Sequence, residues 1–381
     1  KRIIMELSTR DILRQLSNFP GWRTNRKIVV IESDDWGSIR MPSLVAFNKL
    51  EKAGLDLRSR DAERYNLNDT LASSSDLESL FEVLYLFRDT NGNNVVFTSL
   101  CVVANPDFQK IMESDFEEYF YEPFTETLNK YPGCENSFVL WQEGIEKKLF
   151  IPQLHGREHL NIKAWMKALQ NGNQQTRSAF REGFWGFVPD QNKLPGIDFQ
   201  AAFLLDDTTD LEYQRDVIID AVELFKGQFG YSPEYFVPPN GQFNNYLNEV
   251  LKGNGIKFRS APRIQNEPLG HGKHRKVLHY LGQMDRNGIR YITRNCFFEP
   301  SQKGKDWVDS CLNDIKIAFR YNKPAIISSH RANYIGSLNQ ANREKGLEQL
   351  TNLLRGILKK WPDVVFMTTP ELGDLISSKS E

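Results

Sequence analysis

Residues 27–35 read Lys-Ile-Val-Val-Ile-Glu-Ser-Asp-Asp, an apolar run that ends in the carboxylate pair Asp34-Asp35. A second apolar patch, Leu149-Phe150-Ile151, leads into His155-Gly156-Arg157-Glu158-His159. Each stretch is typical of a buried strand that ends in polar side chains. In a parallel α/β sheet, ligands and catalytic groups gather at the carboxyl ends of the strands. The two stretches together therefore predict a three-ligand site for a catalytic divalent metal.

Composition narrows the class of protein. The chain has 381 residues, of which 40% are hydrophobic and 25% charged, so it can bury a sizeable globular core. Its 48 basic and 49 acidic residues nearly cancel, which argues against a nucleic-acid partner, and no apolar run is long enough to span a membrane.

The first residues do not form a signal peptide, so we expect a cytoplasmic protein. A signal removed before Lys1 would instead make it extracytoplasmic. Four widely spaced cysteines predict neither a disulfide framework nor a cysteine zinc site.

Strand-like apolar runs alternate with helix-period segments, which favours a parallel sheet built from βα units. The runs are 27–31, 95–103, 149–154, 201–205, 235–237, 256–260, 289–293, 324–328 and 364–367. The helical segments are 8–16, 42–53, 75–87, 163–169, 210–229, 242–252, 306–320 and 343–361. Seven or eight strands predict an α/β fold, a distorted (β/α) barrel of mostly parallel strands. We expect one barrel domain over residues 1–381.

Two regions interrupt this alternation and are expected as insertions. Residues 104–148 follow the second strand and are rich in aromatic and acidic side chains. Residues 262–293 contain Asn287-Gly288 between two alternating runs, which is a β-hairpin signal. Loops on the carboxyl side of a barrel usually shape the substrate groove, so either insertion is a candidate to do so.

The polar residues at the first two strand ends have ordinary explanations as well as catalytic ones. Asp34-Asp35 allows one carboxylate to hold a metal while the other takes a proton from water, but alone it fits a loop or helix cap equally well. His155 and His159 are four residues apart, so a helical turn that begins at His155 would bring the imidazoles together. A pair of this spacing directly after an apolar strand indicates metal ligands more strongly than a lone histidine does.

Two further strand ends carry candidate residues. His330 ends an apolar strand, and its ordinary pKa near neutrality suits a general acid, the alternative being a cap for the next helix. Pro238-Pro239 stiffens the turn before Asn240, whose backbone amide could stabilise an oxyanion, the alternative being an ordinary turn. The histidine cluster within residues 271–279 has no strand leading into it, so we interpret it as a solvated loop, the alternative being a metal site.

The order of these motifs resembles the polysaccharide deacetylase family (carbohydrate esterase family four, NodB-like) over roughly residues 27–372. Residues 33–37 resemble its first motif and residues 155–159 its second, with glycine in place of the usual hydroxyl residue. Residues 237–241 resemble its third motif and residues 327–330 its fifth. The family has a distorted barrel and removes N- or O-acetyl groups from sugars with a divalent metal, usually zinc.

The resemblance implies that Asp34 is the catalytic base. It departs from the family at Val237, which stands where an arginine normally orients the base. Arg294 is the first candidate to supply that charge and Arg157 the second, and the family's Asp-rich fourth motif is not clear near residues 294–299. The metal ligands implied by the resemblance are Asp35, His155 and His159.

We therefore expect a metal-dependent hydrolase, with zinc as the metal, that removes acetyl groups from a sugar, oligosaccharide or polysaccharide. Asp34 would take a proton from water, the amide near Asn240 would hold the oxyanion, and His330 would protonate the leaving group.

Two other functions remain open. A retaining glycosidase on a related barrel would use Asp34 as nucleophile and a second carboxylate about 5–5.5 Å away. The candidates for that carboxylate are Asp206, Asp207 and Glu299. A carbohydrate-binding homologue with weakened catalysis would account for the missing arginine.

Overall fold

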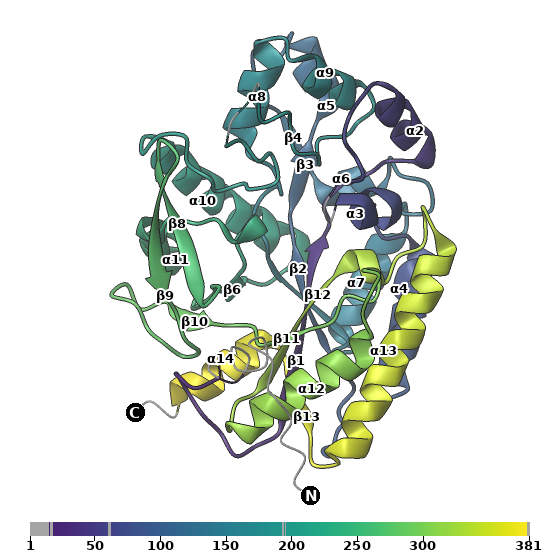
Figure 1. Ribbon diagram of the computed structural model, residues 1–381, viewed down its shortest axis with the longest axis vertical. Coiled ribbons are helices and arrows are strands. Elements are labelled where there is room, and N and C mark those ends of the chain that lie inside the picture. Colours follow the sequence, from purple (N-terminus) through teal and green to yellow (C-terminus); the bar gives the residue numbers. More distant parts are fainter. Residues whose placement is uncertain (1–14, 16–17, 60–61, 193, 195, 379–381) are drawn as a thin grey trace, which may run out of the picture.

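A single parallel sheet organises the fold (Figure 1). The computed structural model describes residue 15 and residues 18–59, 62–192, 194 and 196–378. Eight strands follow the order β10-β7-β6-β5-β2-β1-β12-β11, and β13 pairs with β1 outside this path. All pairings in this sheet are parallel, so the predicted distorted (β/α) barrel is confirmed. The strands are β1 (Ile28–Trp36), β2 (Phe97–Cys101), β5 (Phe150–Leu154), β6 (Tyr235–Phe236), β7 (Phe258–Ser260), β10 (Arg290–Ile292), β11 (Cys296–Phe297), β12 (Ala325–His330) and β13 (Val365–Phe366).

The barrel is open between β10 and β11, which are the two ends of the strand order. Only residues 293–295 connect these two edge strands along the chain, so the link crosses the opening. Arg294 is the middle residue of this link.

Helices cover the outside of the sheet, and α4, α7, α12 and α13 gather on one side of it (Figure 1). Among the described residues, none of the helices is long and apolar enough to cross a membrane. The helices are α2 (Leu44–Lys52), α3 (Ala62–Asn68), α4 (Ser74–Tyr85), α5 (Phe108–Glu113), α6 (Phe124–Leu128), α7 (Ser137–Glu146), α8 (Ile162–Gln170), α9 (Gln174–Arg181), α10 (Asp210–Phe229), α11 (Asn248–Gly253), α12 (Trp307–Arg320), α13 (Gln340–Lys360) and α14 (Thr369–Ser378). Short 3₁₀ turns are η1 (Pro239–Gly241), η2 (Asn245–Leu247) and η3 (Arg331–Asn333).

β1 is the central strand, and all nine of its residues are buried. Its β-branched apolar start suits a strand that is covered on both faces. β2 pairs along one edge of it and β12 along the other, and the register places Asp34 opposite His330. The pairing with β2 shifts between Ser33 and Trp36, where Asp35 adopts a φ of +76°. This irregularity turns the strand end, so two adjacent aspartates can face one pocket.

Both regions expected as insertions carry secondary structure of their own. Residues 104–148 contain the small antiparallel pair β3 (Ala104–Pro106) and β4 (Tyr121–Pro123), together with α5, α6 and α7. Residues 262–293 contain the antiparallel hairpin β8 (Ile264–Gly270) and β9 (Lys273–Leu278), which lies beside α10 and α11 in Figure 1. The signal at Asn287-Gly288 corresponds to a tight turn closed by an isolated antiparallel bridge between Met284 and Arg290.

Several local predictions were wrong. Residues 201–205 form no strand, although Phe203 is buried against Phe236 and Phe243, because burial alone does not make a run of Ala, Phe and Leu extended. The helix predicted over 242–252 is shortened to η2 and α11. The helix predicted over 8–16 lies outside the described residues, apart from the helical Gln15.

The histidine cluster is also organised differently from the prediction. β8 leads directly into it, so it is a hairpin and not a loop. His271 lies in the exposed turn and His274 on exposed β9, whereas His279 is buried and its Nε2 lies 2.7 Å from Gln265 Oε1.

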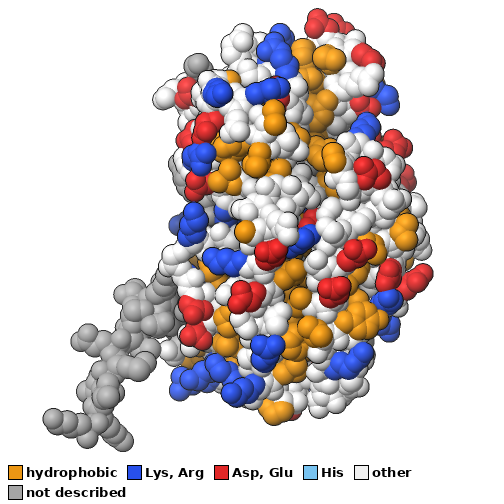
Figure 2. All heavy atoms as spheres, turned by 90° about the vertical axis from the view of Figure 1, so that its right-hand side faces the viewer, with side chains coloured by type: hydrophobic (Ala, Val, Ile, Leu, Met, Phe, Trp, Pro, Cys, Tyr) orange, Lys and Arg blue, Asp and Glu red, His pale blue; other side chains and the backbone are white. Residues whose placement is uncertain are grey.

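The face that carries α13 shows Lys and Arg side chains interspersed with Asp and Glu (Figure 2).

The four cysteines are free and buried.

Candidate active site

Asp35, His155 and His159 converge at the carboxyl end of the sheet, and their ligand atoms all lie within 4.8 Å of one another. Asp35 Oδ1 is 3.5 Å from His155 Nε2 and 3.3 Å from His159 Nε2. All three residues are at most 3% exposed. Two imidazoles that face one carboxylate oxygen form a donor set of two nitrogens and one oxygen, which suits zinc.

The chain holds the two histidines without a helical turn. The segment after β5 is irregular from His155 to Leu160, and α8 begins only at Ile162, so the helical turn considered from the spacing does not form. Gly156 has a φ of +107°, a conformation that glycine adopts without strain. The loop instead brings the imidazole centroids to 5.1 Å from each other.

Each histidine is oriented by a neighbour. The Nδ1 of His155 lies 2.8 Å from the carbonyl oxygen of Val237, so it can donate its proton there and leave Nε2 free as a ligand. The ring of His159 stacks on buried Trp185 at a centroid distance of 6.1 Å. Val237 thus supplies a backbone acceptor at the position where the family resemblance leads one to expect an arginine side chain.

The electrostatics of this cluster favour the protonation states that bind metal. Burial and the positive charge of Arg40 lower the pKa of His159 to about 4, so its imidazole is neutral at pH 7. Burial alone would raise the pKa of Asp35, but Arg40 and the hydrogen bonds to His155 and His159 hold it well below its usual value. A neutral imidazole next to an ionised carboxylate is what a divalent metal requires.

Arg40 links this cluster to a further ion pair that the sequence did not indicate. Its Nη2 lies 3.2 Å from Asp35 Oδ2, and its Nε lies 3.5 Å from Asp69 Oδ2. Asp69 Oδ1 in turn accepts a 3.0 Å hydrogen bond from Nε of the fully buried Arg331. Two arginines and two carboxylates therefore balance one another, which lowers the cost of burying Asp35.

Asp34 is held by Arg294 through two parallel hydrogen bonds. Nη1 donates to Oδ2 at 2.5 Å and Nη2 donates to Oδ1 at 2.6 Å. Burial raises the pKa of Asp34, but the charge and hydrogen bonds of Arg294 outweigh it and the pKa is lowered. Asp34 is therefore ionised at neutral pH and fixed in orientation, as a general base should be.

Arg294 is itself positioned by Glu32, which lies fully buried two residues before Asp34. Arg294 Nε donates to Glu32 Oε2 at 2.5 Å, and the hydroxyls of Tyr235 and Thr369 also bond to the Glu32 carboxylate. Sequence reasoning missed Glu32. Its signal was available, because residues i and i+2 of a strand share one face.

Arg157, the second candidate for orienting the base, lies elsewhere, so that prediction was wrong. Its Nε donates to Glu158 at 2.8 Å and its Nη1 to Asp220 at 2.7 Å. The guanidinium also packs over the ring of Tyr121, 4.2 Å from the centroid. A residue between His155 and His159 can point away from them because the loop there is irregular.

His330 lies on the other side of Asp34, with its Nε2 4.0 Å from Asp34 Oδ2. Its Nδ1 is 2.6 Å from Oε1 of Glu299, a buried carboxylate that also accepts from Arg64 and Asn333. Burial would lower the pKa of His330, but the charge of Glu299 raises it to about 9. His330 is therefore protonated at pH 7 and can donate a proton.

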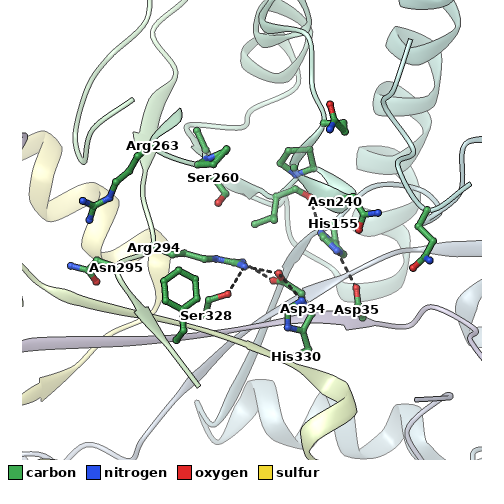
Figure 3. A pocket seen from close by; sticks show the side chains of 18 of the residues that line it. Asp34, Asp35, His155, Asn240, Ser260, Arg263, Arg294, Asn295, Ser328 and His330 are labelled. Carbon is green, nitrogen blue, oxygen red and sulfur yellow. Dashed lines mark hydrogen bonds and ion pairs between the residues drawn. The ribbon is translucent and has the colours of Figure 1, made fainter. Parts of the chain in front are cut away.

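One cavity of about 670 Å³ lies at this end of the sheet (Figure 3). It is lined by the three candidate metal ligands as well as by Asp34, Arg294 and His330. Asn240 also lines it and has a φ of +52°, while its side-chain amide donates to Asp198 at 3.0 Å. The cavity therefore brings together every predicted site residue except Arg157.

Comparison with protein-family models and with curated proteins gives no match. Distant similarity is found to solved structures. Puue allantoinase has a TM-score of 0.47 at 11% identity, covering 97% of this chain and 96% of its own. A GH57-type branching enzyme from the hyperthermophilic archaeon Pyrococcus horikoshii has a TM-score of 0.45 at 11% identity, with coverages of 92% and 70%. A family 4 carbohydrate esterase from Streptomyces lividans has a TM-score of 0.36 at 12% identity, with coverages of 92% and 96%. Because these similarities are so distant, the chemistry must be argued from this chain's own residues.

Proposed function

We propose that this protein is a metal-dependent hydrolase that removes N- or O-linked acetyl groups from a sugar, oligosaccharide or polysaccharide. The observation that carries the proposal is the convergence of a buried Asp-His-His cluster, an arginine-held aspartate and a glutamate-held histidine on one cavity. These three parts supply what acyl transfer to water needs: a place for a Lewis acid, a base and an acid.

Asp35, His155 and His159 are the residues that would hold the metal, and zinc is the metal that we propose. Both histidines turn Nε2 toward Asp35, and the buried Nδ1 of His159 has no hydrogen-bond partner among the described residues. When bound, a divalent ion polarises an acyl carbonyl and makes water more acidic.

The chain's own groups have separate tasks in this proposal. Asp34, kept ionised by Arg294, accepts a proton from the attacking water. His330, kept protonated by Glu299, donates a proton to the leaving amine or alcohol. The backbone amide at Asn240, on the turn that lines the cavity, is proposed to donate to the oxyanion.

The glycosidase alternative is less well supported by the positions of the acids. Glu299 is engaged by His330, Arg64 and Asn333. Asp206 lines a different cavity, and half-buried Asp207 lies 2.8 Å from His271. A retaining mechanism needs a second carboxylate facing the substrate beside Asp34, and none of these three candidates takes that position.

The test is metal analysis of purified protein combined with acetate release from a panel of N-acetylated and O-acetylated sugars. We expect about one zinc per chain, acetate release from at least one sugar, and loss of that activity on chelation with recovery when zinc is restored. Absence of acetate release from every sugar by the metal-loaded protein would contradict the proposal and favour a carbohydrate-binding role.

A further inference from the structure

Three arginines line the large cavity, and two of them have acidic partners. Arg294 is paired with Asp34, and Arg40 is paired with Asp35. Arg263 differs, because no carboxylate, hydrogen bond or ring pairs with its guanidinium within the part of the chain that the structure describes. The cavity therefore contains one arginine that is paired with no carboxylate of the described residues.

Arg263 occupies a defined position in the fold. It follows β7, and its carbonyl oxygen accepts a 2.9 Å hydrogen bond from the backbone nitrogen of His279. In Figure 3 its side chain lies across the cavity from His155 and Asp35, on the side of Asn295. It thus lies at the end of the cavity away from the candidate metal ligands.

This guanidinium is substantially desolvated. Its residue is half-buried, and its Nη1 is buried without a hydrogen-bond partner. Burial lowers the pKa of Arg263 to about 10, so the group is still charged at pH 7. A buried donor and charge without a partner carry a desolvation cost, which a bound anion would remove.

The nearby Lys323 experiences the same positive charge. Burial, then Arg23 and Arg263, lower the pKa of Lys323 to about 8. Its ammonium donates hydrogen bonds to the backbone carbonyls of residues 20–22, and its positive charge adds to the local positive potential. Arg263 and Lys323 also share the lining of a small adjoining cavity.

We propose that Arg263 binds an anionic substituent of the substrate, so that the acetylated sugar carries a carboxylate, sulfate or phosphate group. The guanidinium offers a planar fork of donors that matches such oxygens. Exposed Asn266 also lines the cavity, where its side-chain amide could bond to a hydroxyl of the same sugar. The amide of Asn295 is already bonded to Asn18, Pro324 and Ile326. This proposal rests on the proposed deacetylase function for its substrate, but anion binding at Arg263 can be tested separately.

The binding experiment is calorimetric titration with glucuronate, glucose 6-sulfate and glucose 6-phosphate, with neutral glucose as the reference. The proteins are wild type, Arg263→Ala, Arg263→Lys and the control Arg286→Ala. Arg286 is exposed in the turn before Asn287-Gly288 and does not line the cavity, so this control removes the same charge elsewhere.

We expect wild type and Arg286→Ala to bind at least one anionic sugar ten times more tightly than glucose. Arg263→Ala should lose this preference and Arg263→Lys should keep part of it, while glucose binding is unchanged. The anion that binds best identifies the substituent. Equal affinity of wild type for glucose and all three anions, or an unchanged preference in Arg263→Ala, would overturn the proposal.

Acetate release separates this proposal from the function on which it rests. Wild type and Arg263→Ala are compared on N-acetylglucosamine and on the derivative with the preferred anion. We expect Arg263→Ala to lower kcat/KM 10- to 100-fold for the anionic sugar only. Arg263-dependent anion binding without acetate release would overturn the deacetylase function and leave the anion site standing. Acetate release that does not depend on Arg263 would overturn the anion site and leave the deacetylase function standing.

Discussion

Asp34 and Asp35 are neighbours on one strand, yet their surroundings have little in common. Asp34 is held by Arg294 and faces His330, whereas Asp35 faces two imidazoles and Arg40. The positive φ of Asp35 and the shifted register at the end of β1 separate the two side chains. A single residue step can therefore divide proton transfer from metal binding, and each prediction below tests one part of that division.

The largest effect is expected from the two aspartates themselves. Asp34→Asn should lower kcat about 10²–10⁴-fold and leave the zinc content unchanged, because a general base need not ligate the metal. Asp35→Asn and His155→Ala should lose zinc and activity together. Metal analysis and acetate release on the same samples check this. Similar zinc loss in Asp34→Asn and His155→Ala would show that Asp34 does not have a role separate from metal binding.

Arg294→Ala should have the next largest effect. Two buried carboxylates, Glu32 and Asp34, would lose their shared cation, so we expect destabilisation of about 3–5 kcal/mol. Arg294→Lys keeps the charge and serves as the folded control. Asp34 is proposed to act as base only when it is ionised. Arg294 lowers its pKa by charge and by paired hydrogen bonds, and lysine keeps the charge but not the paired bonds, so the acid limb of the pH–rate profile should move partway to higher pH in Arg294→Lys. An unchanged limb would show that the paired hydrogen bonds of Arg294 do not lower the pKa of Asp34.

Glu299→Gln should change the alkaline limb instead. His330 acts as an acid only when protonated, and Glu299 raises its pKa to about 9, so wild-type activity should fall as pH rises through about 9. Without Glu299 this fall should begin nearer pH 6.5. Because the folded pKa is the higher one, stability from this pair is complete below about pH 6.5 and is lost as pH rises through about 9. If wild type and Glu299→Gln show the same alkaline limb, His330 is not the residue that donates the proton.

Arg157→Ala should have the smallest effect. The side chain is bound by Glu158 and Asp220, so we expect kcat/KM within about twofold of wild type and a modest loss of stability. Steady-state kinetics and thermal unfolding check this. If Arg157→Ala instead lowers kcat/KM by much more than twofold, Arg157 would again be a candidate to orient the base.

The strand ends explain how much of the site could be predicted. Asp34, His155 and His330 follow apolar runs, and parallel strands deliver their carboxyl ends to one edge, so proximity follows from local sequence. Arg40 and Glu299 follow no such rule, because their roles depend on how distant segments pack. Arg263 likewise could not be singled out from the sequence, because only the structure shows that no described carboxylate pairs with it.

The strands of the sheet could also be predicted only in part from the sequence. β1 and β5 were predicted because β-branched and apolar residues mark strands that are buried on both faces. Residues 201–205 are equally apolar but are used to fill space beside Phe236 and Phe243. Burial is decided by the whole fold, so an apolar run cannot by itself distinguish a strand from a buried turn.

The position of β1 between β2 and β12 has a consequence for folding. Asp34 meets His330 only when a strand from near the start of the chain pairs with one from near its end. Contacts of such sequence separation must close a long loop first, and they slow folding. The link of residues 293–295, which leads into β11 beside β12, brings Arg294 to Glu32 and Asp34 of β1. Asp34, the proposed base, therefore acquires its counter-charge only after these distant segments have packed together, and catalytic competence should be among the last properties to appear during refolding.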